Sequence, residues 1–284
     1  MKTIFALVLI CIVVAPAQTK PDTKLTPAEV IAKHLESIGP AEARARVQGT
    51  RIKGASVVSV KLCGEGQVEG EALLASQGTA NLINLKFETS EYPFELLRYD
   101  GKKFLASPYK PGSRTCLAQF FLDNEVIFRE GLAGGVLSES WPLLKIDERN
   151  PKLEYSGLKK VGGRDLHALR YAPRKGSEMK IMLYFDPQTF QHVRTEYSQV
   201  LYASEQRRIG AVTSSGLPAA NQTASNARIE AYEEFSDFKT EGGLNLPHTY
   251  KFHLSIQSEL RPALVDWVLN LTDFAFNVPF DPAQ

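Results

Sequence analysis

The sequence predicts an α+β protein built mainly from one antiparallel β-sheet. The stretch from Tyr155 to Tyr197 is the clearest indication, because it contains three strand-like runs, at 166–171, 180–185 and 192–197, in which two sets of side chains alternate with a period of two, such as Ile181, Leu183 and Phe185 against Lys180, Met182 and Tyr184. Gly-Gly, Pro and Asp-Pro turns interrupt this alternation. Successive strands joined by such turns form an antiparallel meander.

The amino-terminal residues predict export. Lys2 precedes an apolar run from Ile4 to Val14, and Ala15-Pro16-Ala17 places small residues at a cleavage position. This arrangement is typical of a secretory signal peptide over residues 1–17. The apolar run is too short for the ~20 residues that span a bilayer as a helix.

The three cysteines have different expected fates. Cys11 lies in the signal peptide and follows Ile10, where a lipid-attachment signal has a small residue, so we expect no lipid on Cys11. Cys63 and Cys116 stay in the exported chain, where oxidising conditions allow a disulfide worth ~4 kcal/mol in the chain-entropy model. Two separate buried thiols are the alternative, because the sequence does not fix their geometry.

Composition and charge exclude some functions. The chain has 33 basic and 32 acidic residues, and no basic patch stands out, which argues against nucleic-acid binding. Hydrophobic residues make up 43% of the chain, as in ordinary packed domains. We expect residues 18–284 to form a single domain and the protein to be a monomer.

The first element of the mature chain is a helix. Thr26 can cap it, Pro27 suits its first position, and Glu29 completes a capping box. Gly39-Pro40 ends it. One face is apolar and needs a broad apolar surface to pack on, with Val30, Ile31, His34, Leu35 and Ile38.

The sequence pattern predicts strands over most of the remaining chain. The Asp100-Gly101 turn between two apolar runs is a strong hairpin signal. Residues 123–144 break the rhythm and predict two short helices with a glycine-rich join, either a hinge in a lid or a simple corner. Residues 209–226 predict a flexible loop between strands. We expect ten or eleven strands in all.

Catalytic and metal-binding patterns are absent from the sequence. The five histidines lack the spacing of metal ligands. Glu233 and Glu234 are adjacent and should point to opposite faces of a strand, so with Asp237 we interpret them as a solvated strand end. We therefore predict no enzyme activity, no metal and no cofactor.

Several short motifs follow one another in an order found in a known family. They are SIG at 37–39, NLINLKF at 81–87, YPFE at 92–95, DG at 100–101, VGGR at 161–164, MLYFDP at 182–187, FSDF at 235–238 and GLNLP at 243–247. With the signal peptide, this order resembles the periplasmic lipoprotein-carrier superfamily, the LolA/LolB-like fold, in a divergent outer-membrane lipoprotein-sorting branch.

The resemblance implies a strongly curved antiparallel sheet, an incomplete barrel, whose concave face is covered by a few helices and receives acyl chains. The well-studied carriers use an arginine to hold the helical lid closed. Residues 76–81 contain no arginine, so no residue is assigned this role.

These expectations define a candidate hydrophobic cavity, although each of its residues can equally be core. We predict an exported bacterial protein that binds or carries an acyl chain, a lipid or an acylated lipoprotein in the periplasm. The alternative is a periplasmic sensor or protein-interaction module that offers the same sheet to an envelope protein. The expected cavity residues are Ile83, Leu85, Phe87, Leu132, Trp141, Ile181, Leu183 and Phe185.

Overall fold

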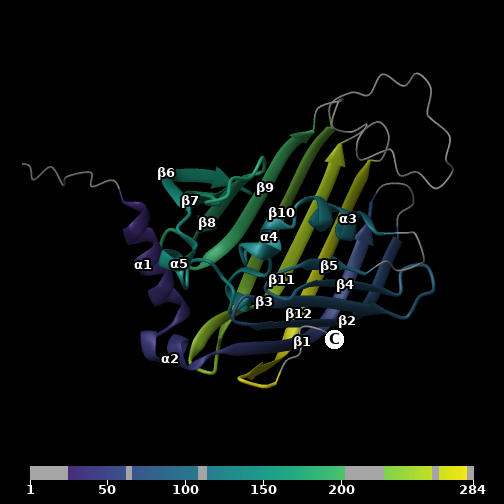
Figure 1. Cartoon of the computed structure of the whole chain (residues 1–284), viewed down its shortest axis with the longest axis horizontal. Coiled ribbons are helices and arrows are strands. Elements are labelled where there is room, and N and C mark those ends of the chain that lie inside the picture. Colours follow the sequence, from purple (N-terminus) through teal and green to yellow (C-terminus); the bar gives the residue numbers. More distant parts are fainter. Residues whose placement is uncertain (1–24, 62–65, 108–113, 202–226, 258–261, 280–284) are drawn as a thin grey trace, which may run out of the picture.

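The computed structural model describes residues 25–61, 66–107, 114–201, 227–257 and 262–279 (Figure 1). The signal peptide, Cys11, Cys63 and the 209–226 loop lie outside the described residues. The described residues form a 12-stranded antiparallel sheet with five α-helices. The predicted fold class is confirmed, with slightly more strands than the ten or eleven expected.

The first and last strands of the chain lie side by side at the centre of the sheet. Its strand order is β5-β4-β3-β2-β1-β12-β11-β10-β9-β8-β7-β6, so the first and last strands pair with each other. The strands of the first half are β1 (Gly49–Val60), β2 (Gly66–Gln77), β3 (Ala80–Phe87), β4 (Phe94–Tyr99) and β5 (Phe104–Ala106). Those of the second half are β6 (Lys152–Val161), β7 (Arg164–Ala172), β8 (Lys180–Phe185), β9 (His192–Leu201), β10 (Ala227–Glu241), β11 (Leu244–Gln257) and β12 (Ala263–Phe276).

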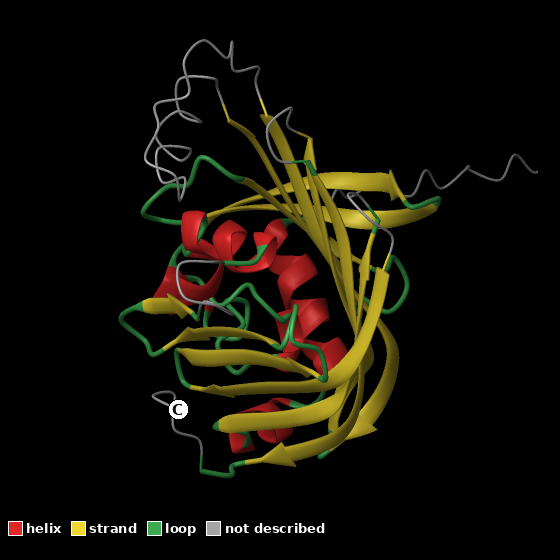
Figure 2. Ribbon diagram, turned by 90° about the vertical axis from the view of Figure 1, so that its right-hand side faces the viewer, coloured by secondary structure: helices red, strands yellow, loops and turns green. Residues whose placement is uncertain are grey.

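Helices fill the concave side of the sheet, and Figure 2 shows the strands curving around them. The segment 116–149, which we call the plug, connects the two halves of the sheet. It contains α3 (Cys116–Asp123), α4 (Val126–Arg129), a 3-10 turn (Gly135–Leu137) and α5 (Ile146–Arg149). The sequence predicted two short helices with a glycine-rich join within 123–144, where the structure has α4 and the 3-10 turn; α3 and α5 flank that stretch. Two further helices, α1 (Pro27–Ile38) and α2 (Ala41–Arg46), precede the sheet.

Capping explains where two of the helices begin. The Thr26 hydroxyl accepts a hydrogen bond from the Glu29 backbone N–H at 3.2 Å, and the Glu29 carboxylate accepts one from the Thr26 N–H at 2.7 Å. This capping box confirms the predicted start of α1. Thr115 caps α3 in the same way, accepting from the Ala118 N–H at 3.0 Å.

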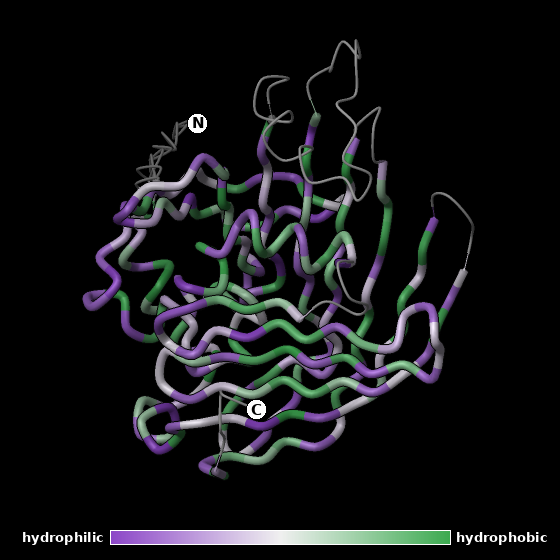
Figure 3. Tube along the Cα trace, turned by 45° about the vertical axis from the view of Figure 1, so that its right-hand side comes forward, coloured by the Kyte–Doolittle hydropathy of each residue, from purple (hydrophilic) through white to green (hydrophobic). Residues whose placement is uncertain are grey.

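Alternation along each strand separates an inner from an outer surface. Figure 3 shows apolar and polar residues alternating along the strands. Ile181 and Leu183 of β8 join the main core on the concave side. Met182 and Tyr184, between and after them, belong to a second, smaller cluster on the convex side. No helix among the described residues is long and apolar enough to cross a membrane.

Candidate functional site

The eight predicted cavity residues all lie in the main core of the concave face. Each is at most 8% exposed. Leu132 and Trp141 come from the plug, whereas the other six come from β3 and β8. All eight therefore belong to the one core that the sheet forms with the plug. Their contact with a ligand stays a prediction.

Glu233 holds the plug to the sheet. Its carboxylate is fully buried and accepts three hydrogen bonds: from the Gly134 backbone N–H of the plug at 2.8 Å, from the Tyr197 hydroxyl at 2.8 Å and from the Tyr250 hydroxyl at 2.6 Å. Burial raises the pKa of Glu233 to about 7, against the opposing effect of these donors. The interpretation of Glu233 as part of a solvated strand end is therefore wrong, whereas Glu234 is partly exposed, Asp237 is exposed, and Glu234 lies on the opposite strand face, as predicted.

Other buried polar side chains of the sheet form hydrogen bonds with the plug. Thr50 donates to the Leu137 carbonyl at 3.1 Å, and the Ser76 hydroxyl accepts from the Glu139 N–H at 2.8 Å. Asn81 donates to the Phe128 carbonyl at 3.3 Å, and Tyr171 donates to the Glu130 carboxylate at 2.9 Å. Because isolated buried polar groups are unfavourable, these contacts fix the position of the plug.

Helix α1 is joined to the plug through a buried histidine. His34 accepts a hydrogen bond at Nε2 from Trp141 Nε1 at 3.0 Å, and its Nδ1 lies 3.1 Å from the Phe190 carbonyl oxygen. A carbonyl can only accept, so Nδ1 carries the proton and His34 is neutral. Burial lowers the pKa of His34 to about 4. His192, also fully buried, stacks on Trp141 with ring centroids 4.5 Å apart.

Two glycines let the plug approach its surroundings closely. A Cβ atom at Gly131, where φ is +76°, would lie 1.9 Å from the Ser140 carbonyl oxygen. A Cβ atom at Gly135 would lie 2.7 Å from the Phe235 ring. The glycine-rich join is thus a tightly packed corner in this state.

A largely apolar hollow of about 310 Å³ opens where the start of α3 meets β1, β2 and β12. We call it the mouth hollow. Val60, one of its lining residues, is 37% exposed, whereas Trp267 is buried at its base. Its other lining residues are Val58, Val68, Glu91, Tyr92, Arg114, Thr115, Cys116, Pro262, Ala263, Leu264 and Val265.

A buried carboxyl group lies beside the mouth hollow. Glu95 is 1% exposed and accepts a hydrogen bond from the Tyr92 hydroxyl at 2.7 Å. Tyr92 in turn accepts one from Trp267 Nε1 at 2.8 Å. Burial raises the pKa of Glu95 to about 7. The chain of contacts fixes the Tyr92 and Trp267 rings as walls of the hollow.

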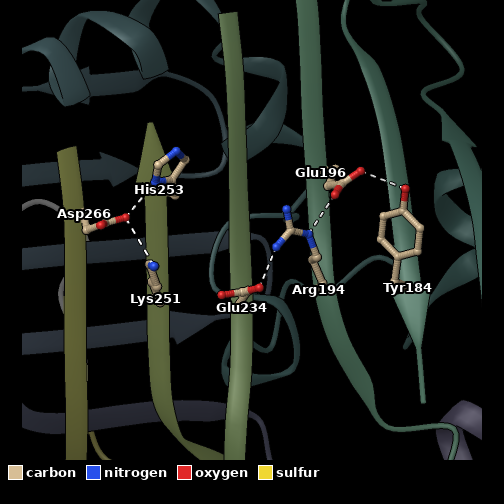
Figure 4. A network of polar contacts seen from close by, with 7 residues as sticks. All are labelled: Tyr184, Arg194, Glu196, Glu234, Lys251, His253 and Asp266. Carbon is tan, nitrogen blue, oxygen red and sulfur yellow. Dashed lines mark hydrogen bonds and ion pairs between the residues drawn. The ribbon is translucent and has the colours of Figure 1, made fainter. Parts of the chain in front are cut away.

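Polar contacts cross five strands of the convex face (Figure 4). The Asp266 carboxylate lies 2.6 Å from Lys61 Nζ, 3.4 Å from Lys251 Nζ and 2.6 Å from His253 Nδ1. Burial alone would raise the pKa of Asp266, but these cationic and hydrogen-bonding neighbours hold it below its ordinary value.

A His–Asp pair can serve catalysis, yet no hydroxyl or thiol of the described residues hydrogen-bonds to the His253 ring. Likewise, no cluster of three metal-ligating side chains occurs among them.

Sequence reasoning missed the side chains that hold the plug. Glu233, Asn81 and His34 were visible as polar residues in otherwise apolar strands or helix faces, which is the available signal for a buried polar contact. Their partners include backbone atoms of the plug, at Gly134 and Phe128, and side chains such as Tyr197, Tyr250 and Trp141, all distant in the chain. A sequence pattern does not specify such partners.

A scan of family models and a search of curated proteins find no match to the chain. Among solved structures, a LolA superfamily protein from Nitrosomonas europaea is similar at a TM-score of 0.44 and 11% identity, covering 90% of this chain and 96% of that one. A putative outer membrane lipoprotein-sorting protein domain from Vibrio parahaemolyticus has a TM-score of 0.41 and 11% identity, covering 88% and 93%. A DUF1329 family protein from Desulfovibrio piger has a TM-score of 0.39 and 10% identity, covering 90% and 95%.

The superfamily that the sequence resembles is represented among these structures. At such identities and TM-scores, they carry no information on what this chain binds. Its function has to be derived from its own residues.

Proposed function

We propose that this chain is an exported, non-catalytic protein of the bacterial periplasm that binds an acyl chain, with the mouth hollow as the first contact. The hollow carries this proposal, because its volume of about 310 Å³ lies within the ~300–1,000 Å³ of small-molecule sites and most of its lining is apolar. Each methylene moved from water into such a site contributes ~0.8 kcal/mol.

Deeper uptake requires displacement of the plug. The eight predicted cavity residues belong to the same core cluster as the plug's apolar side chains, so a longer chain in the core has to replace those side chains. Apolar contacts would then be exchanged for similar apolar contacts. The hydrogen bonds that the plug donates to Glu233 and His34, and the one that it accepts from Asn81, would be lost, each worth ~1 kcal/mol net. These polar contacts therefore set how readily the site opens.

The cargo class is the acyl group, either of a lipid or of an acylated lipoprotein. Nothing in the proposed mechanism needs a bond to form or break, so neither a cofactor nor a catalytic residue takes part. A neutral Glu95 suits this role, because a carboxyl group that stays protonated below about pH 7 keeps charge away from the hollow.

Native mass spectrometry of the mature protein purified from its own periplasm tests the proposal. We expect a mass excess that matches a lipid or acylated peptide and disappears on organic extraction. The extracted protein should then take up palmitic acid. Val60→Asp places a charge in the hollow at an exposed position and should weaken uptake. Val200→Asp is the matched control, since Val200 is 51% exposed on β9 and does not line the hollow.

A bare mass together with no uptake of palmitic acid would refute acyl binding. Equal effects of the two valine variants would refute the mouth hollow as the entry. Leu183→Arg is not a useful probe, although Leu183 was expected to line a cavity, because the side chain is fully buried and an arginine there would disrupt the fold.

A further inference from the structure

A groove of about 870 Å³ lies on the convex face over β6 to β9, at one end of the sheet. It is separated from the plug by the sheet itself. Met182 and Tyr184 of β8 line the groove, whereas their neighbours Ile181 and Leu183 point into the concave core. A ligand in this groove would therefore leave the acyl site untouched.

The groove concentrates positive charge that the whole chain does not have. Five cationic side chains and two carboxylates line it, although basic and acidic residues are nearly equal over the full sequence at 33 and 32. Sequence reasoning found no basic patch, because strand pairing brings these residues together from four strands. The cationic side chains are Lys159, Lys160, Arg170, Lys180 and Arg194.

Both carboxylates of the groove already have cationic partners. Glu154 lies 3.7 Å from Arg170. Glu196 accepts from Arg194 at 2.8 Å and from the Tyr184 hydroxyl at 2.7 Å (Figure 4). Arg194 is further fixed by Glu234 of β10 at 2.5 Å. Each carboxylate of the groove is therefore paired with an arginine, and Arg194 is shared between Glu196 and Glu234.

The three lysines remain as uncompensated charge. Lys159, Lys160 and Lys180 are exposed, and none forms an ion pair with another described residue. Asp165 stands opposite Lys160 in the β6–β7 register but forms no ion pair with it. Charged side chains with free ammonium groups around a concave surface attract an anionic partner.

The floor of the groove adds an apolar component. Met182 and Tyr184 are less than 9% exposed, and Val161 packs against the same cluster. A peptide segment that carries both carboxylates and apolar residues can contact the lysines and the apolar floor.

We propose that this groove binds an acidic peptide segment of a partner protein. Its carboxylates pair with Lys159, Lys160 and Lys180, and its apolar side chains contact Met182 and Val161. A small anion is a poorer fit, because no contact among the described residues holds the three ammonium groups in a convergent arrangement. A lipid surface fits less well than a narrow segment, because the charged lining surrounds a recess.

Fluorescence anisotropy of a labelled peptide of alternating glutamate and valine, titrated with the mature chain, tests the proposal. We expect Lys159→Glu/Lys160→Glu/Lys180→Glu to weaken binding by about tenfold or more, and salt to weaken binding to the wild type. The control is Lys53→Glu/Lys86→Glu, which makes a similar change in another hollow of the sheet, lined by β1 to β3 and β12. It should bind the peptide as the wild type does.

Several results would overturn the assignment. They are no binding by the wild type, equal losses in the triple variant and the control, or equal binding of a lysine–valine peptide. Full competition by millimolar inorganic phosphate would instead indicate a small-anion site. Binding of phosphatidylglycerol vesicles but not of the peptide, lost in the triple variant, would indicate a membrane surface. Palmitic acid uptake by the triple variant should be unchanged, which separates this surface from the acyl site.

Discussion

Trp141 of the plug donates a hydrogen bond to His34 of α1 at 3.0 Å, across 107 positions of the chain. Both side chains are fully buried. The contact makes α1 part of the closed arrangement, because the helix cannot leave without exposing an unpaired indole N–H in the core.

This relationship predicts coupling between the two residues. His34→Phe should destabilise the protein by about 1–3 kcal/mol, since it leaves the Trp141 N–H buried and unpaired. Trp141→Phe also removes an aromatic contact. In a double-mutant cycle measured by denaturant unfolding and circular dichroism, the double variant should lose less stability than the sum of the single variants. Simple additivity would contradict the contact.

Acid should weaken the same contact. The pKa of His34 falls from its ordinary 6.5 to about 4 on folding, so the unfolded state binds the proton first. Stability is then lost as pH falls from about 6.5 to about 4, by up to about 3 kcal/mol from this residue. The free energy of unfolding of His34→Phe should lack that part of the decrease; an unchanged decrease would place the titration elsewhere.

Glu233 predicts the opposite pH dependence. Its pKa rises from 4.5 in the unfolded chain to about 7 in the fold, so the folded state keeps a proton that the unfolded state loses. Its contribution is present below about pH 4.5 and is lost as pH rises to about 7, by up to about 3 kcal/mol. Denaturant unfolding of Glu233→Gln between pH 4.5 and 8 should lack this loss.

Glu95 is the matched control for Glu233, because its pKa is also raised to about 7 by burial but it does not contact Gly134. Glu95→Gln should remove a similar pH-dependent loss. Only Glu233→Gln should also alter the plug, measured as faster amide hydrogen exchange at Gly134. Equal exchange in the two variants would argue against Glu233 as an anchor of the plug.

Substitution of Gly131 by alanine should lower stability by a steric clash in addition to backbone strain. Gly131→Ala places a methyl group against the Ser140 carbonyl, whereas Gly163→Ala has a similar φ of +82° and no atom within 4 Å. Gly163→Ala should lower stability by about 1–2 kcal/mol through the left-handed backbone alone. Gly131→Ala should lower it by about 1–3 kcal/mol more through overpacking. Thermal unfolding compares them, and equal losses would show that the plug can relax.

The disulfide stays a prediction. Cys116 has no bonded partner among the described residues and lines the mouth hollow with Val60, while Cys63 follows Val60 by three positions in the sequence. If Cys63 and Cys116 form the disulfide, the unreduced, unfolded mature protein contains no titratable thiol. Reduction should then lower stability by about 4 kcal/mol. Two thiols per chain before reduction would show that the cysteines are unpaired.

Local patterns determined much of the fold. The Thr26–Glu29 capping box, the Asp100-Gly101 turn and the alternation in β8 depend on neighbouring residues, so the sequence predicted them correctly. It also placed Ile181 and Leu183 on one strand face and Met182 on the other, because side chains alternate along any strand.

The tertiary structure alone decided which strand faces are concave, which side chains hold the plug there and where charge collects. The sequence indicated a surface position for Glu233, but in the curved sheet this residue lies under the plug, where Gly134, Tyr197 and Tyr250 donate hydrogen bonds to it. Lys159 and Lys180 belong to one groove only because β6 to β9 pair side by side. The physical reason is the same in each case: burial, the pKa values it shifts and local charge density depend on neighbours that are distant in sequence, whereas turns and alternation do not.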